Sequence, residues 1–178
     1  IIQNSQLISL ELFPTEMLLI ENMFIVDTGF DINIFYHYKY SSQIHVKSLN
    51  RFTMQLDAKN EEIITFYDVN ETPFYSTNFH VEKGQLHAFL TTEIFVYEIK
   101  FIMFAEWDYS IVSKYFVQQG LGRGSVQINY SEHFLTVLVD PEPAQRNIYV
   151  FSREENTKDL VSPFYYVNAE TMKINLEK

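Results

Sequence analysis

Residues 30–40 read FDINIFYHYKY and decide the fold class, because large apolar or aromatic residues alternate with mostly polar ones. The even positions carry Phe, Ile, Ile, Tyr, Tyr and Tyr, whereas the odd positions carry Asp, Asn, Phe, His and Lys. A period of two is typical of a β-strand with one buried face. Residues 43–47 and 51–57 keep the same parity. The pattern therefore predicts neighbouring antiparallel strands in a mostly β chain.

The longest apolar and aromatic stretch covers residues 92–109, and every odd position from 95 to 109 is apolar or aromatic. We expect a single strand here of about 15 residues, far above the usual length of about 5–6. A strand of that length must twist and bend, so the sequence predicts a long, strongly curved antiparallel sheet that closes toward a barrel. Shorter strands are predicted at residues 125–131, 133–140, 147–152, 163–168 and 172–176.

Evidence for helices is thin, and we expect at most one or two short ones. Residues 108–119 are compatible with a short helix, because one stripe is apolar and Gly120 follows its end. Residues 15–26 fit either a helix or a strand. Residues 31–57 and 95–140 share the order of an aromatic strand, a break and shorter strands, which indicates a repeated supersecondary shape. Residues 1–178 are interpreted as one β-rich domain, either complete or part of a larger protein or assembly.

Composition excludes several functional classes. The 178 residues carry a net charge of −10 and no cysteine, and 47% of them are hydrophobic. The acidic balance argues against nucleic acid and against electrostatic docking on anionic lipid, which both need basic clusters. Without cysteine there is no disulfide or thiolate site, and no apolar run reaches the roughly 18 residues of a transmembrane segment. The chain does not start with Met, which slightly favours a processed, secreted or lumenal protein.

The sharpest catalytic string is Asp27-Thr28-Gly29, preceded by two apolar residues. It resembles the motif of aspartic proteases, in which two facing carboxylates activate water. One such string occurs, so the catalytic pair would need a homodimer that contributes Asp27 from each chain. The alternative is an ordinary turn that opens a strand. The glycines at 120–124 are expected to serve a tight turn, because no phosphate-loop pattern surrounds them.

Other polar residues give weaker signals. The five histidines show no compact metal-ligand spacing, and His37 and His45 are expected to lie on one solvated strand face. Glu106 and Asp108 flank Trp107, as paired carboxylates do in glycosidases, but the solvent side of a strand has the same pattern. We therefore predict no metal, no cofactor and no catalytic residue other than the alternative Asp27.

The stretch from residue 93 to 140 resembles the lipid-binding barrel of the bactericidal/permeability-increasing and lipopolysaccharide-binding protein family, the tubular lipid-binding superfamily. The resemblance rests on the aromatic strand Ile94–Tyr109 that ends in Trp107-Asp108-Tyr109, on Gly122-Arg123-Gly124 with the strand after it, and on residues 134–140. Residues 31–57 look similar. The resemblance implies a curved sheet around an apolar groove in which lipid acyl chains are buried.

Our first expectation is therefore a non-enzymatic protein that binds lipid or another hydrophobic ligand. The alternatives are a structural or interaction subunit, whose core its own side chains fill and whose partners are other protein subunits, and the dimeric protease. The residues expected to contact the ligand are apolar or aromatic members of the two alternating stretches: Ile32, Ile34, Tyr36, Phe95, Tyr97, Ile99, Phe101, Met103 and Trp107.

Overall fold

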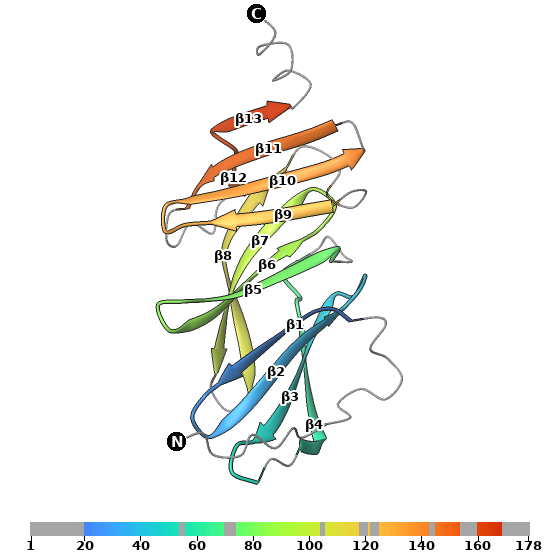
Figure 1. The fold of residues 1–178 in the computed structure, drawn as a ribbon, viewed down its shortest axis with the longest axis vertical. Helices are drawn as coiled ribbons and strands as arrows, with labels where there is room; N and C mark the ends of the chain where they lie inside the picture. The colour runs from blue at the N-terminus through green and yellow to red at the C-terminus, as the bar shows by residue number, and fades with distance from the viewer. Residues whose placement is uncertain are drawn as a thin grey trace, which may run out of the picture.

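The computed structural model describes residues 20–53, 56–69, 74–103, 106–117, 121, 125–142, 145–153 and 160–168. All regular elements in these residues are strands (Figure 1). They are β1 (Ile20–Asp27), β2 (Asp31–Tyr38), β3 (Gln43–Asn50), β4 (Leu56–Thr65), β5 (Ser76–Glu82), β6 (Gln85–Thr91), β7 (Phe95–Met103), β8 (Trp107–Phe116), β9 (Ser125–Tyr130), β10 (Phe134–Glu142), β11 (Gln145–Ser152), β12 (Leu160–Val161) and β13 (Tyr165–Asn168). The prediction of a mostly β chain is confirmed. The strand expected at residues 172–176 lies outside the described residues.

The strands form three separate sheets. The N-terminal sheet has the order β1-β2-β3-β4, the central sheet β12-β8-β7-β6-β5, and the C-terminal sheet β13-β11-β10-β9. Figure 1 shows them following one another along the long axis of the molecule, from blue through green and yellow to red. Each sheet in the described part of the chain is open, with two edge strands. The expected closure of one long sheet toward a barrel is therefore wrong.

The single long strand predicted for residues 92–109 is a hairpin of β7 and β8. These strands pair antiparallel, with Met103 opposite Trp107 and Phe101 opposite Tyr109. Next to this turn, odd-numbered residues of β7 are opposite odd-numbered residues of β8 and therefore point to the same face of the sheet. The odd–even alternation of the sequence thus continues from β7 into β8, although the chain reverses its direction. The short helix expected at 108–119 is also wrong, because residues 107–116 form β8.

The N-terminal and central sheets contact each other along two pairs of strands, β1 with β5 and β4 with β8. Between β1 and β5, the Thr77 amide donates to Glu21 Oε2 at 3.1 Å, and the Asn22 side chain donates to the Thr77 carbonyl. Between β4 and β8, the Trp107 amide donates to Glu62 Oε1. The first strands of the N-terminal and central sheets therefore lie side by side, as do their last strands.

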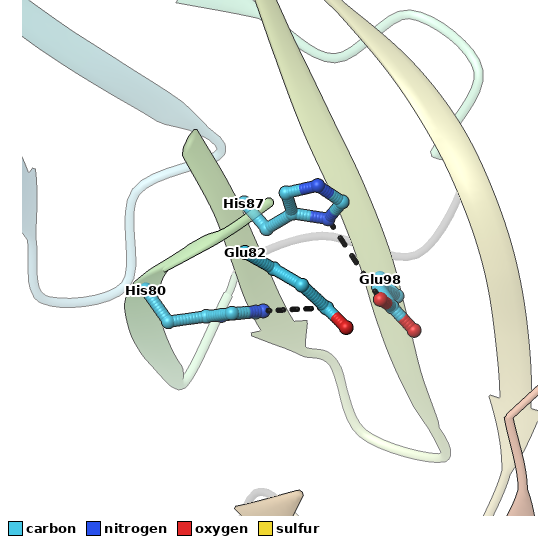
Figure 2. Close-up of side chains that lie close together, drawn as sticks. All are labelled: His80, Glu82, His87 and Glu98. Atoms are coloured by element: carbon cyan, nitrogen blue, oxygen red, sulfur yellow. Dashed lines mark ion pairs between the residues drawn. The ribbon is translucent and has the colours of Figure 1, made fainter. Parts of the chain in front are cut away.

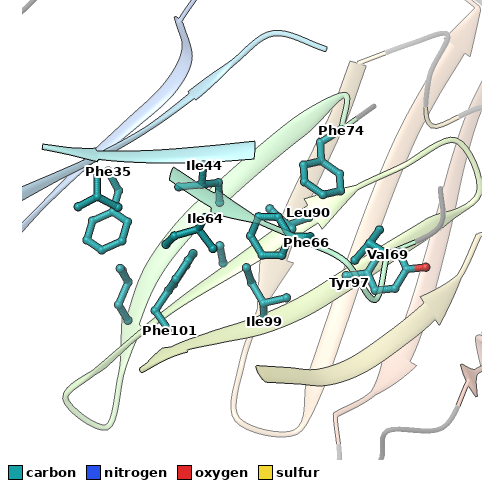
Figure 3. Packing of buried hydrophobic residues seen from close by; sticks show 13 residues of the cluster. Phe35, Ile44, Ile64, Phe66, Val69, Phe74, Leu90, Tyr97, Ile99 and Phe101 are labelled. Carbon is teal, nitrogen blue, oxygen red and sulfur yellow. The ribbon is translucent and has the colours of Figure 1, made fainter. Parts of the chain in front are cut away.

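Two apolar cores hold the three sheets together. The first core lies between the N-terminal and central sheets and includes Phe35, Ile44, Tyr97, Ile99 and Phe101 (Figure 3). The second core lies between the central and C-terminal sheets and includes Phe89, Val96, Tyr115, Leu135, Val137 and Phe151. Because alternate residues of a strand point to opposite faces, β7 contributes Tyr97 to one core and Val96 to the other. The central sheet is therefore covered on both faces.

Between β11 and β13 the chain contributes one short strand to the central sheet. After β11, the two-residue strand β12 pairs parallel with β8 of the central sheet, and β13 then pairs antiparallel with β11. In the part of the chain that the structure describes, no helix has the length and apolar character needed to cross a membrane.

Candidate functional site

The expected ligand-contacting residues of β7 and β8 lie in the first core. Phe95, Tyr97, Ile99 and Phe101 share one face of β7, and Trp107 packs beside them. The Phe35 ring lies 4.9 Å from the Trp107 ring and 5.3 Å from the Phe101 ring, measured between centroids. Met103 is half exposed at the end of the strand. The chain's own N-terminal sheet therefore covers the aromatic stripe.

The expected ligand residues of β2 are not brought to that stripe. Phe35 points into the first core, so the residues on either side of it, Ile34 and Tyr36, point to the outer face of the N-terminal sheet, as does Ile32. There the Tyr36 ring stacks on His45 at 5.2 Å, and its hydroxyl donates to Glu61.

Asp27 is the last residue of β1 and leads into the turn to β2. Its Oδ1 accepts a hydrogen bond from the Gly29 amide at 2.8 Å and pairs with Arg51 Nη1 at 3.2 Å. The carboxylate is about half exposed, at 49%. This is the geometry of an Asx turn, in which the side chain replaces a backbone acceptor.

His37 and His45 do not share a face, contrary to expectation. His45 is opposite Tyr36 and His37 is opposite Ile44, so the register places the two histidines on opposite sides of the sheet. His37 is fully buried, with Nε2 3.0 Å from the Ser41 carbonyl oxygen and Nδ1 3.5 Å from Glu21 Oε2. Glu106 and Asp108 are both exposed, on either side of the partly buried Trp107. Of the glycine segment 120–124, the described residues include Leu121, which is buried in the second core.

A cluster of four titratable side chains, His80, Glu82, His87 and Glu98, stands on one face of the central sheet (Figure 2). His80 is directly opposite His87 in the β5–β6 hairpin. Glu98 of β7 is opposite Phe89, which lies two residues from His87 and therefore on the same face. One ligand atom from each of the four residues lies within 4.8 Å of all the others. We call these four residues the His–Glu cluster.

A tight turn sets the register of this cluster. Lys83 and Gly84 have φ values of 49° and 77° between the paired residues Glu82 and Gln85. Two positive φ values in a two-residue loop define a type I′ turn, which matches the twist of the strands it joins. The turn therefore fixes His80 opposite His87.

Arg153, directly after β11, connects the cluster to the C-terminal sheet. Its Nη2 lies 2.6 Å from Glu82 Oε2 and 2.5 Å from Glu98 Oε1. Its Nε lies 3.3 Å from Glu98 Oε2, and its Nη1 donates to the Ser131 carbonyl. The side chains of Arg153 and Glu98 are 7% and 3% exposed. The guanidinium is therefore a buried bridge between two sheets.

Aromatic residues enclose the cluster. The His80 ring stacks on Phe89 at 4.8 Å and lies 4.2 Å from the Tyr130 ring. Tyr115 donates from its hydroxyl to Glu98 Oε2 at 2.8 Å. Low exposure and these rings reduce the local dielectric constant, which strengthens charge interactions and penalises any unpaired polar atom.

The pKa values follow from this burial and pairing. Burial, assisted by the charges of His87 and Arg153, lowers the pKa of His80 to about 4. Burial alone would raise the pKa of Glu98, but neighbouring His87 and Arg153 outweigh it and lower the pKa to about 2. Burial also disfavours the charge of Arg153, yet its bonds to Glu98 and Glu82 raise its pKa. At neutral pH the cluster thus contains a neutral imidazole, a buried carboxylate and a guanidinium.

The sequence contained a signal for this cluster that our interpretation missed. Lys-Gly stands between two runs of alternating residues, and a two-residue hairpin loop at 83–84 pairs residue 80 with residue 87. The contributions of Glu98 and Arg153 depend on pairing between distant segments, which spacing does not indicate.

No protein-family model matches this chain, and no curated protein or solved structure shows significant similarity to it. The resemblance to the bactericidal/permeability-increasing protein family therefore stays a prediction.

Proposed function

We propose that this chain is a structural and protein-interaction scaffold, built like an arc of a β-propeller, and that it acts without catalysis. The observation that carries the proposal is the face-to-face packing of three consecutive sheets, each with four antiparallel strands, to which the central sheet adds the two-residue parallel strand β12. Blades of four strands stacked in this way are the unit of β-propellers. The interfaces between the sheets are filled by the chain's own rings, as a scaffold requires.

Stacked sheets leave an end face that needs a partner. Each repeated unit buries its apolar side against the next one, so a terminal unit has one uncovered face. On the outer face of the N-terminal sheet, Met23, Tyr36, His45 and Ile63 form one row across all four strands. Ile25 lies in the next row. On the two edge strands of this face, Met23, Ile25 and Ile63 are 45%, 58% and 49% exposed, whereas Tyr36 between them is buried.

We assign this outer face to a sheet from a second copy of the chain. The inner faces of the N-terminal and C-terminal sheets already accept a sheet of the same chain through apolar side chains. Two copies each carry a net charge of −10 and repel one another, so salt should strengthen their association. Contact between an end face and a different surface of the next copy would be heterologous and could propagate.

The test is sedimentation velocity over a range of protein and salt concentrations. We expect self-association that grows with salt and is lost in Ile25→Asp and Ile63→Asp. The control is Phe52→Asp, which places the same charge on an exposed aromatic in the turn after β3 and should associate like wild type. A chain that stays monomeric throughout would overturn the assignment to a second copy.

Native mass spectrometry separates the scaffold from a lipid carrier. A scaffold whose interfaces are filled by its own side chains should be detected at the mass of its polypeptide alone. A mass excess that organic extraction identifies as lipid would contradict the proposal. It would mean that the N-terminal sheet moves away from Phe101 and Trp107 to admit the ligand.

A further inference from the structure

The His–Glu cluster contains side chains that the scaffold function does not use. His80 is 5% exposed, and neither of its ring nitrogens has a hydrogen-bond partner among the residues that the structure describes. Nδ1 of His87 is unpartnered in the same sense. A buried polar atom without a hydrogen-bond partner destabilises the fold. These nitrogens are directed at the two carboxylates: His80 Nε2 lies 3.8 Å from Glu82 Oε2, and His87 Nδ1 lies 3.8 Å from Glu98 Oε1 (Figure 2).

A positive charge already occupies the point where these groups converge. Nη2 of Arg153 contacts the same two oxygens, Glu82 Oε2 and Glu98 Oε1, that the imidazoles approach. One guanidinium balances the charge of one of the two carboxylates. It provides no hydrogen-bond partner for either ring nitrogen of His80 or for Nδ1 of His87. A divalent cation would balance both carboxylates and would use the lone pair of each imidazole.

We propose that the His–Glu cluster is a binding site for a divalent transition-metal ion of the zinc type, which enters by displacing the guanidinium of Arg153. The ligands are His80, Glu82, His87 and Glu98, a set of two nitrogen and two oxygen donors. Imidazole favours zinc and its neighbours over magnesium and calcium, which take oxygen ligands alone. Four such donors suit tetrahedral coordination.

The surroundings allow the exchange. Glu82 is the most accessible ligand, with its side chain 22% exposed, whereas Glu98 is 3% exposed. Metal can therefore meet Glu82 first and then the buried ligands. Arg153 has other contacts that do not involve the carboxylates: Nη1 donates to the Ser131 carbonyl, and the guanidinium lies 5.5 Å from the Tyr130 ring centroid. The displaced side chain thus retains partners.

The test is titration of the full chain with Co²⁺, followed by displacement with Zn²⁺. Tetrahedral Co²⁺ has intense visible absorption bands, so we expect a saturable spectrum that Zn²⁺ abolishes. His80→Gln and His87→Gln should each weaken binding by about 100-fold or more, because even residues that only orient ligands contribute about 10–100-fold. His133→Gln, which changes an exposed histidine in the β9–β10 turn, should bind as wild type does.

A second variant tests the displacement of Arg153. Arg153→Met has no guanidinium to remove, so Zn²⁺ should raise its melting temperature more than it raises that of wild type. Should the variant fold only with Zn²⁺, that rescue supports the site equally. The absence of a saturable Co²⁺ spectrum in wild type, or binding that His80→Gln and His87→Gln leave unchanged, would overturn the proposal.

Discussion

The central sheet is attached to its two neighbours in different ways. Toward the N-terminal sheet it presents apolar and aromatic side chains, with Phe101 and Trp107 packed around Phe35. Toward the C-terminal sheet it presents an apolar centre and, beside it, the buried ion pair of Glu98 and Arg153. Apolar contact depends on buried area and shape, whereas a buried ion pair depends on position. We infer that the first interface supplies stability and that the second also fixes how the C-terminal sheet is placed.

The largest effect is expected in the aromatic interface. Phe101→Ala removes a side chain that is 4% exposed and contacts Phe35. We expect the free energy of unfolding to fall by about 3–5 kcal/mol, because transfer energy is lost and a cavity remains. Urea denaturation measures this loss of unfolding free energy, and the m-value, the slope of free energy against urea concentration, should stay unchanged. Met103→Ala on the same strand, where the side chain is half exposed, should change it by about 0.5 kcal/mol or less. A small loss at Phe101 would show that the two sheets are loosely packed.

A somewhat smaller effect is expected in the mixed interface. Glu98→Leu leaves Arg153 buried without its main partner and should cost about 3 kcal/mol, at the low end for broken buried pairs, because Glu82 still pairs with Arg153. Adding Arg153→Met should restore most of this loss, because both members of the ion pair are then removed and neither charge stays buried without the other. Equilibrium unfolding of both single variants and the double variant gives the coupling energy. If the losses of the two single variants simply add up in the double variant, Glu98 and Arg153 are not energetically coupled, which would contradict this prediction.

A third prediction compares turns in the N-terminal and central sheets. Gly29 and Gly84 have φ values of 91° and 77°, and a Cβ added at either would meet nothing within 4 Å. Alanine at each position should therefore cost about 1 kcal/mol from backbone conformation alone. Thermal unfolding measures both variants. A much larger loss for Gly84→Ala would show that its turn also supports the histidines opposite each other in the hairpin.

The smallest effect is expected from pH on the outer face of the N-terminal sheet. Burial would raise the pKa of Glu61, but Tyr36, His45 and Lys47 outweigh it and hold the pKa below its usual 4.5. A carboxyl whose folded pKa is depressed stabilises above its unfolded pKa and loses that contribution as pH falls through the folded pKa. Glu61 is 38% exposed, so we expect about 0.5 kcal/mol or less. The difference in unfolding free energy between wild type and Glu61→Gln should shrink below pH 4.5; a constant difference would contradict this cause.

The fold class could be predicted because alternation is a local property of each strand. The same alternation misled at residues 95–109, where odd residues stay on one face through the turn between Met103 and Trp107. The alternation also could not show which face of β2 meets the core, because the inward direction of Phe35 depends on its packing against Phe101 of another sheet. The stacking of the sheets depends on contacts between distant segments, and these have no local signature.

The candidate site was less predictable than the fold. Our interpretation considered the histidines by their spacing along the chain and found no compact set. In the structure, the Lys83-Gly84 turn brings His80 and His87 together, and that part was accessible from turn chemistry. Arg153 reaches Glu98 from 55 residues away, a contact that exists only after the central and C-terminal sheets have assembled.

The short strand β12 has a consequence for how the molecule comes apart. The chain completes three strands of the C-terminal sheet, returns to pair Leu160 and Val161 with β8, and only then adds β13. A force applied at the C-terminal end of the described chain would have to peel β13 and then β12 before it could reach β11. Through β12, the C-terminal sheet is therefore held to the central sheet. Amide hydrogen exchange should accordingly report the two sheets opening as one cooperative unit.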